Sequence, residues 1–148
     1  MLLSSWLQTP SIPKVGFDDV LVAIKAPETY VLINTLPLTR QDCLIQRSVV
    51  ASDEEALMND LLNRYKHHTT HIVVYGTHAS DTTVETKYHQ LRALGFAHVY
   101  VYAGGMFEWM LLQDIYGHDE FPTTSRTRDI LRFQPTGVFR VPRLTDGR

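Results

Sequence analysis

Cysteine is almost absent from this chain, since Cys43 is the only one among 148 residues. A single thiol cannot form an internal disulfide, and it excludes zinc sites built from several cysteines. Long apolar runs are also lacking, because none approaches the ~18 residues of a membrane-spanning helix. The start, MLLSSWLQTPSIPK, has too short an apolar stretch and no basic region for a secretory signal. These absences predict a soluble protein of the cytoplasm with no membrane segment.

Positive charge is scarce until the C-terminal end of the chain. Residues 1–125 carry 8 Lys and Arg against 14 Asp and Glu (8 − 14 = −6), whereas residues 126–148 carry 6 Arg against 2 Asp (6 − 2 = +4). Arginine forks suit phosphate and carboxylate groups, so a weak contact between this tail and a polyanion is one hypothesis. A solvated tail and a tail docked on its own acidic domain are the alternatives, and the modest density of arginine favours them.

Three unbroken apolar runs of strand length predict the centre of a sheet, at residues 30–34 (YVLIN), 71–76 (HIVVYG) and 98–102 (HVYVY). An apolar run without alternation is typical of a strand buried on both faces of a parallel sheet. A weaker strand is predicted at residues 48–51.

Helices are predicted between these strands. FDDVLVAIK ends before Pro27, and residues 52–66 have a capping box formed by Ser52 and Glu55. A third helix has an apolar face and ends at Gly95, and a fourth spans residues 106–116 and ends at Gly117. One more short helix is expected within residues 121–133. The face of the third helix is made by Val84, Tyr88, Leu91 and Leu94. Alternating strands and helices predict right-handed crossovers and a three-layer α/β domain.

The order of motifs after residue 72 resembles the rhodanese-like domain. A strand ends in VVYG, a loop and an amphipathic helix end in LGF, the strand HVYVY follows, and the pair Gly104–Gly105 precedes Trp109. The resemblance spans residues 15–118 and implies a central, mostly parallel sheet flanked by helices. It divides the chain into an N-terminal segment (1–14), a rhodanese-like domain (15–131) and an arginine-rich extension (132–148), in which Val138, Phe139 and Val141 are possible docking points.

A softer resemblance joins GGMFEWMLLQDIYG and the following FPTT to rhodanese-like proteins of large DNA viruses and protists. If the protein is viral, a location in the virion is the alternative to the cytoplasm.

The loop in VVYGTHASDTT departs from the active members of that family. Their strand is followed directly by a cysteine that carries a persulfide, and this position is Gly76 here. Five residues later they often have an arginine, where this chain has Asp81. Glycine supplies no nucleophile, and a carboxylate repels a thiolate, thiosulfate or phosphate. The family's Asp and Arg after the earlier strand fall near Asn34 and Thr35. The resemblance therefore implies this fold without sulfurtransferase or cysteine-phosphatase activity.

The vestigial active-site loop is also the candidate binding site. His78, Ser80 and Asp81 are the residue types of an acyl-transfer triad, but one tight loop cannot easily align them. Residues 80–83 all favour helix N-caps, so we expect one of them to begin the next helix and the side chain of Asp81 or Ser80 to satisfy the loop N–H groups. His78 is expected to be solvated. The candidate residues are Gly76, Thr77, His78, Ala79, Ser80, Asp81 and Thr82.

Three histidines and the single cysteine are the remaining candidates for chemistry. His67, His68 and His71 suggest a metal site, but no cysteine or carboxylate cluster lies nearby, and neither a metal nor another cofactor is predicted. Cys43 is interpreted as a small buried hydrophobe.

The sequence thus predicts a catalytically inactive rhodanese-like protein that acts as a protein-binding, regulatory or structural module. Its partner would be another protein or a second copy of itself. The alternatives are a sulfur or thiol transfer enzyme that uses Cys43 as a relocated thiol, and an assembly component whose basic tail contacts a polyanion.

Overall fold

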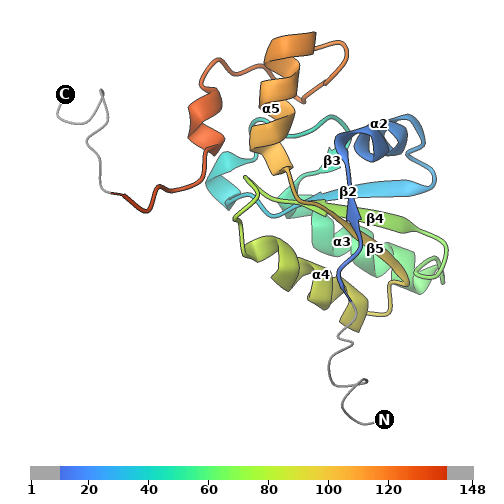
Figure 1. Ribbon diagram of the computed structural model, residues 1–148. Helices are drawn as coiled ribbons and strands as arrows, with labels where there is room; N and C mark the ends of the chain where they lie inside the picture. The colour runs from blue at the N-terminus through green and yellow to red at the C-terminus, as the bar shows by residue number, and fades with distance from the viewer. Residues whose placement is uncertain (1–10, 140–148) are drawn as a thin grey trace.

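A five-stranded parallel sheet forms the centre of the protein (Figure 1). The computed structural model describes residues 11–139 of the chain. The strands are β1 (Lys14–Val15), β2 (Tyr30–Asn34), β3 (Ser48–Val49), β4 (His71–Tyr75) and β5 (His98–Tyr102), in the spatial order β1-β5-β4-β2-β3. The three apolar runs therefore occupy the centre, as predicted, because only a strand covered on both faces is apolar throughout.

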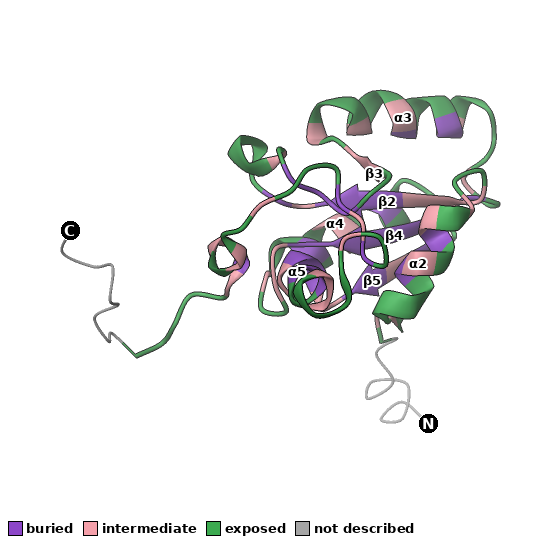
Figure 2. Ribbon diagram, turned by 90° about the horizontal axis from the view of Figure 1, so that it is seen from above, coloured by how far each residue is buried: buried purple, intermediate pink, exposed green. Residues whose placement is uncertain are grey.

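Helices cover both faces of this sheet. They are α2 (Phe17–Lys25), α3 (Ala51–Asn63), α4 (Thr83–Ala93) and α5 (Gly105–Tyr116), with short 3-10 turns η1 (Leu38–Arg40) and η2 (Ile130–Phe133). Figures 1 and 2 show α2 and α5 on one face and α3 and α4 on the other. The predicted three-layer α/β architecture is confirmed.

Each face of the sheet has its own apolar core, because side chains alternate along every strand. Leu32 and Val73 point towards α2 and α5, where Trp109 is fully buried. Their neighbours Ile33 and Ile72 point towards α3 and α4. The sheet is thus fixed from both sides, and its strand ends hold the loops in place.

The start of α3 differs from the prediction. The helix begins at Ala51 rather than after Ser52, and its N-cap residue Val50 makes no side-chain cap hydrogen bond. The side-chain oxygen of Gln41 instead accepts the Ala51 N–H at 2.9 Å. The predicted capping box is therefore wrong, because a distant glutamine satisfies this helix end.

Two other expectations also need correction at the ends of elements. Leu94 was placed on the buried face of α4, but it follows the last helical residue and is exposed. The edge strand β1, which lies across the predicted boundary between the N-terminal segment and the domain, was not foreseen. Its two residues are too few to show any pattern, and they form a strand because β5 lies alongside.

The beginning of the predicted C-terminal extension packs on the domain. Phe133 is 0% exposed and belongs to the core on the α2 and α5 face. Arg132 forms an ion pair with Asp42 at 2.8 Å. Val138 and Phe139 are 90% and 87% exposed, so the prediction that they dock on the domain is wrong. Val141, the third expected docking residue, lies outside the described residues.

None of the helices within residues 11–139 is both long enough and apolar enough to cross a membrane.

Candidate functional site

The candidate loop lies where the order of successive strands reverses across the sheet. After β2 the chain moves outward to β3, and α3 then carries it back to β4 on the other side of β2. Open α/β sheets bind ligands at the carboxyl ends of the strands beside such a reversal. Asn34 ends β2 at this edge and Thr35 and Leu36 follow it, while the loop from Gly76 to Thr82 follows β4.

The first turn of α5 holds the beginning of the loop. The carbonyl oxygens of Gly76 and Thr77 accept the N–H groups of Met106 and Phe107, each at 2.9 Å. Gly105 makes this approach possible, because it has φ +65° and a Cβ there would lie 2.6 Å from the Gly76 oxygen. The loop backbone is therefore fixed by main-chain contacts that require no particular side chain in the loop.

The carboxylate of Asp81 occupies the N–H groups of the loop. Its Oδ2 accepts the Thr77 N–H at 2.9 Å, and its Oδ1 accepts the Thr83 N–H at 3.1 Å and the Thr83 hydroxyl at 2.5 Å. Thr82 has helical backbone angles, so Asp81 acts as the N-cap of α4 although the regular helix begins one residue later. The prediction that Asp81 or Ser80 satisfies the loop is confirmed for Asp81.

The same carboxylate fills the space beside Gly76. A Cβ added at Gly76 would lie 2.5 Å from Asp81 Oδ2 and 2.6 Å from a methyl carbon of Val84. Both distances are far shorter than an ordinary van der Waals contact. Gly76 does not have a positive φ, so its backbone could accept a side chain and it is the neighbours that exclude one.

The hydrogen bonds to Asp81 set its ionisation. Partial burial on its own would raise the pKa of this carboxyl group. The bonds from Thr77 and Thr83 and the nearby His78 act in the opposite direction and outweigh it, so the pKa of Asp81 lies below its ordinary value of 3.8. The loop therefore holds a permanent negative charge at neutral pH.

The remaining loop residues do not assemble a triad. His78 is half-buried rather than fully solvated, and its Nδ1 accepts the backbone N–H of Ser80 at 3.2 Å. Among the described residues, no hydrogen bond joins the Ser80 hydroxyl to His78 or to Asp81. Ala79 and Ser80 are exposed. The loop residues line an open groove of about 390 Å³, together with Thr35 and Pro37.

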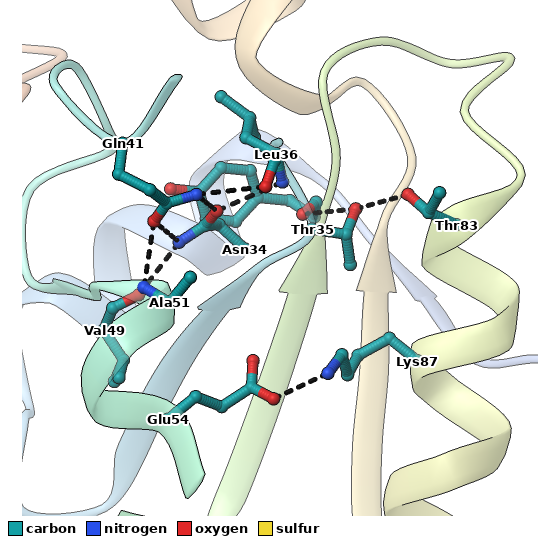
Figure 3. Close-up of polar contacts among 10 residues, drawn as sticks. Asn34, Thr35, Leu36, Gln41, Val49, Ala51, Glu54, Thr83 and Lys87 are labelled. Atoms are coloured by element: carbon teal, nitrogen blue, oxygen red, sulfur yellow. Dashed lines mark hydrogen bonds and ion pairs between the residues drawn. The ribbon is translucent and has the colours of Figure 1, made fainter. Parts of the chain in front are cut away.

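The buried Asn34, near which the resemblance implies charged residues, is paired with the half-buried side chain of Gln41. Asn34, only 3% exposed, exchanges two hydrogen bonds with the side chain of Gln41, at 3.0 and 2.8 Å (Figure 3). Its amide also donates to the Val49 carbonyl at 2.9 Å, and its oxygen accepts the Leu36 N–H at 3.1 Å. Sequence reasoning missed Gln41, because a glutamine in a polar loop has no pattern that marks it.

The other candidate residues are separate from the loop. Cys43 is 0% exposed, and its Sγ contacts the carbonyl of Ser125 at 3.4 Å. His71 stacks on His98, with 4.4 Å between ring centroids, at the opposite end of the strands. Within residues 11–139 no group of three or more His, Cys, Asp or Glu could hold a metal ion. That no metal or cofactor binds stays a prediction.

The sequence profile described as rhodanese-like domain matches residues 17–112, so the chain belongs to the rhodanese-like domain family. A search of curated proteins found no significant match. The resemblance to viral and protist variants stays a prediction.

Solved structures share the fold at low sequence identity. A full-length protein from Lactobacillus plantarum is 21% identical, with 84% of this chain and 94% of that one covered and a TM-score of 0.55. A protein from Bacillus halodurans is 16% identical, with 67% and 72% covered and a TM-score of 0.52. A rhodanese-like domain from Anabaena is 22% identical, with 67% and 95% covered and a TM-score of 0.47. The similarity to the first two of these structures shows a shared fold alone.

Proposed function

We propose that this rhodanese-like domain transfers no sulfur and acts as a protein-binding, regulatory or structural module. One observation carries the proposal. The Asp81 carboxylate lies 2.5 Å from the point where a Cβ of residue 76 would begin. The position that resembles the family's nucleophile is thus a glycine, and the space for any side chain there is filled by an acidic group.

The chemistry of sulfur transfer explains why this matters. A thiolate attacks the outer sulfur of a donor such as thiosulfate, sulfite leaves, and the persulfide is held by backbone N–H groups. In this loop the Thr77 and Thr83 N–H groups are already bonded to Asp81. A negative charge at this point repels both the thiolate and the anionic donor.

The relocated-thiol alternative receives little support from the position of Cys43. Its side chain has no solvent exposure and lies in the core on the α2 and α5 face. Reaction with thiosulfate would require the core around Cys43 to open. A protein that transfers no sulfur requires no such opening of the core.

A sulfur-transfer assay from thiosulfate to cyanide tests the proposal, with thiocyanate as the product. We expect no turnover above a buffer blank for the wild type or for Cys43→Ser. Gly76→Cys should also be inactive, because its side chain meets Asp81 and Val84. The double variant Gly76→Cys with Asp81→Arg removes the carboxylate and reverses the charge, so it is the variant in which activity should first be detected. Wild-type turnover that disappears in Cys43→Ser would overturn the proposal in favour of the relocated thiol.

A weak contact with polyanions stays a secondary proposal, supported by the arginines that the structure describes before residue 140. Arg132 is engaged with Asp42, whereas Arg126 and Arg128 are exposed. Charge removal at Arg126 and Arg128 should therefore lower the salt concentration that elutes the protein from immobilised nucleic acid. Retention that is unchanged in this double variant, or absent in the wild type, would exclude a contribution from these two residues.

A further inference from the structure

A second concave surface lies beside the loop, between α3 and α4. It is a cleft of about 430 Å³, a size that suits a small-molecule ligand. The carboxyl end of β2 forms one wall, and the first turn of α3 and the first two turns of α4 form the other two (Figure 3). It shares only Thr35, Thr82 and Thr83 with the groove over the loop.

Three polar contacts fix the walls of this cleft relative to one another. Gln41 joins β2 to α3, because it bonds to both Asn34 and the Ala51 N–H. The hydroxyls of Thr35 and Thr83, 2.8 Å apart, join the end of β2 to α4 (Figure 3).

The third contact is the ion pair between Lys87 Nζ and Glu54 Oε2, which joins α4 to α3 at 2.6 Å. Both side chains are largely buried, with 24% and 19% exposed. Each wall is part of a helix or a strand, or consists of residues that are hydrogen-bonded to a helix or a strand. The cleft is therefore a preformed site, and a ligand would not have to order it.

The chemistry of the lining is polar but carries no net charge. Glu54 and Lys87 are the only ionised residues that line the cleft, and they neutralise each other. The other polar groups are an asparagine, a glutamine and four threonines. The amide of Asn34 is already fully hydrogen-bonded within the protein, so the glutamine and the threonine hydroxyls are the groups that can donate to a ligand and accept from it. The exposed side chain of Leu38 adds a small apolar surface, to which the buried Leu36 contributes only an edge.

This lining disfavours an anionic ligand. The N-termini of α3 and α4 would attract one, but Asp53, Glu54 and Glu85 in their first turns offset that effect. The negative charge of Asp81 is one residue away from the edge of the cleft. A neutral molecule with several hydroxyl groups matches the mixture of donors and acceptors without an uncompensated charge.

We propose that the cleft binds a small uncharged polyhydroxylated molecule of the monosaccharide type. The hydroxyl groups would bond to the side chains of Thr86 and Gln90, which are exposed and lie one turn apart on α4. The carbon face would lie against Leu36 and Leu38. This site does not depend on whether the protein transfers sulfur.

Titration of the isotope-labelled full-length protein, followed by the amide signals of the first turns of α3 and α4, tests the proposal. The probes are D-glucose, D-ribose and myo-inositol, with inorganic phosphate and glycine as charged comparisons. We expect saturable shifts with at least one polyol, with a dissociation constant in the millimolar range or tighter.

Matched variants assign the shifts to the cleft. Thr86→Leu and Gln90→Leu change exposed side chains that line it, so each should weaken binding at least about 10-fold without unfolding the protein. Thr69→Leu changes an exposed threonine just before β4, at the far end of the strands, and should bind as the wild type does. Absence of saturation with every polyol, saturation by phosphate alone, or binding unchanged in Thr86→Leu and Gln90→Leu would each overturn the proposal.

Discussion

A methyl group added at Gly76 should destabilise the protein, and Asp81 should be the main reason. In Gly76→Ala the new Cβ would lie 2.5 Å from Asp81 Oδ2 and 2.6 Å from Val84 Cγ2. Val84 is only 6% exposed and cannot move freely, so either the loop shifts or the carboxylate leaves its hydrogen bonds. Overpacking of this kind typically costs about 1–3 kcal/mol, which is the destabilisation we expect.

The role of Asp81 can be separated by a double-mutant cycle. In an Asp81→Ala background the carboxylate is absent and only the Val84 contact remains. In that background, the alanine at residue 76 should lower the free energy of unfolding by about 1 kcal/mol less than it does in the wild type. This difference is the coupling free energy between residues 76 and 81, and it exceeds the usual deviation from additivity of independent mutations. Urea unfolding followed by circular dichroism measures all four proteins, and an unchanged m value would show that the same transition is compared.

Gly137→Ala is a matched control for the loss of glycine. A Cβ at Gly137 would meet only the Phe139 carbonyl oxygen, at an ordinary 3.7 Å. This variant should unfold within about 0.5 kcal/mol of the wild type. If Gly76→Ala is as stable as Gly137→Ala, or if the effects of Gly76→Ala and Asp81→Ala simply add, then Asp81 does not fill the space beside Gly76.

Three further predictions concern the loop and the core. Asp81→Ala should lower the free energy of unfolding by about 1 kcal/mol, or the melting temperature by roughly 3–5 °C. His78→Ala should have a smaller effect, because His78 contributes one exposed hydrogen bond, and equal losses in thermal melts would refute the N-cap role of Asp81. Because the pKa of Asp81 in the folded protein lies below 3.8, the stabilisation by its carboxylate is fully present above about pH 4 and is lost as the pH falls through that lower pKa. The difference in unfolding free energy between the wild type and Asp81→Asn should therefore shrink between pH 5 and pH 2, and a constant difference would contradict this prediction. Cys43 is fully buried, so a thiol reagent should label it quickly in denaturant but slowly in the native protein, and equal rates would show that the core around it opens readily.

The centre of the fold was predictable because its signals are local. The runs at residues 30–34, 71–76 and 98–102 are apolar without alternation apart from Asn34, His71 and His98 at their ends, a pattern typical of strands buried on both faces of a sheet. The cap of α4 was also predictable, because an Asp-Thr-Thr stretch before an amphipathic segment is a local arrangement. Here the hydrogen bonds connect residues only a few positions apart.

The parts that were missed depend on contacts between distant residues. Gln41 caps α3 ten positions away, and β1 is a strand only because β5 lies beside it. The burial of Phe133 likewise depends on packing against distant elements and not on its neighbours in sequence. The sequence has Asp81 where the resemblance leads one to expect an arginine, but it does not reveal that this carboxylate lies where a side chain of residue 76 would begin.

The most direct test of the central claim is the mass of the intact protein after incubation with thiosulfate, under conditions in which an active rhodanese gains one sulfur atom. We predict that the mass of the native protein is unchanged, because Gly76 cannot carry a persulfide and Cys43 is buried. A gain of one sulfur atom by the folded wild type, absent in Cys43→Ser, would contradict the account and identify Cys43 as a sulfur carrier.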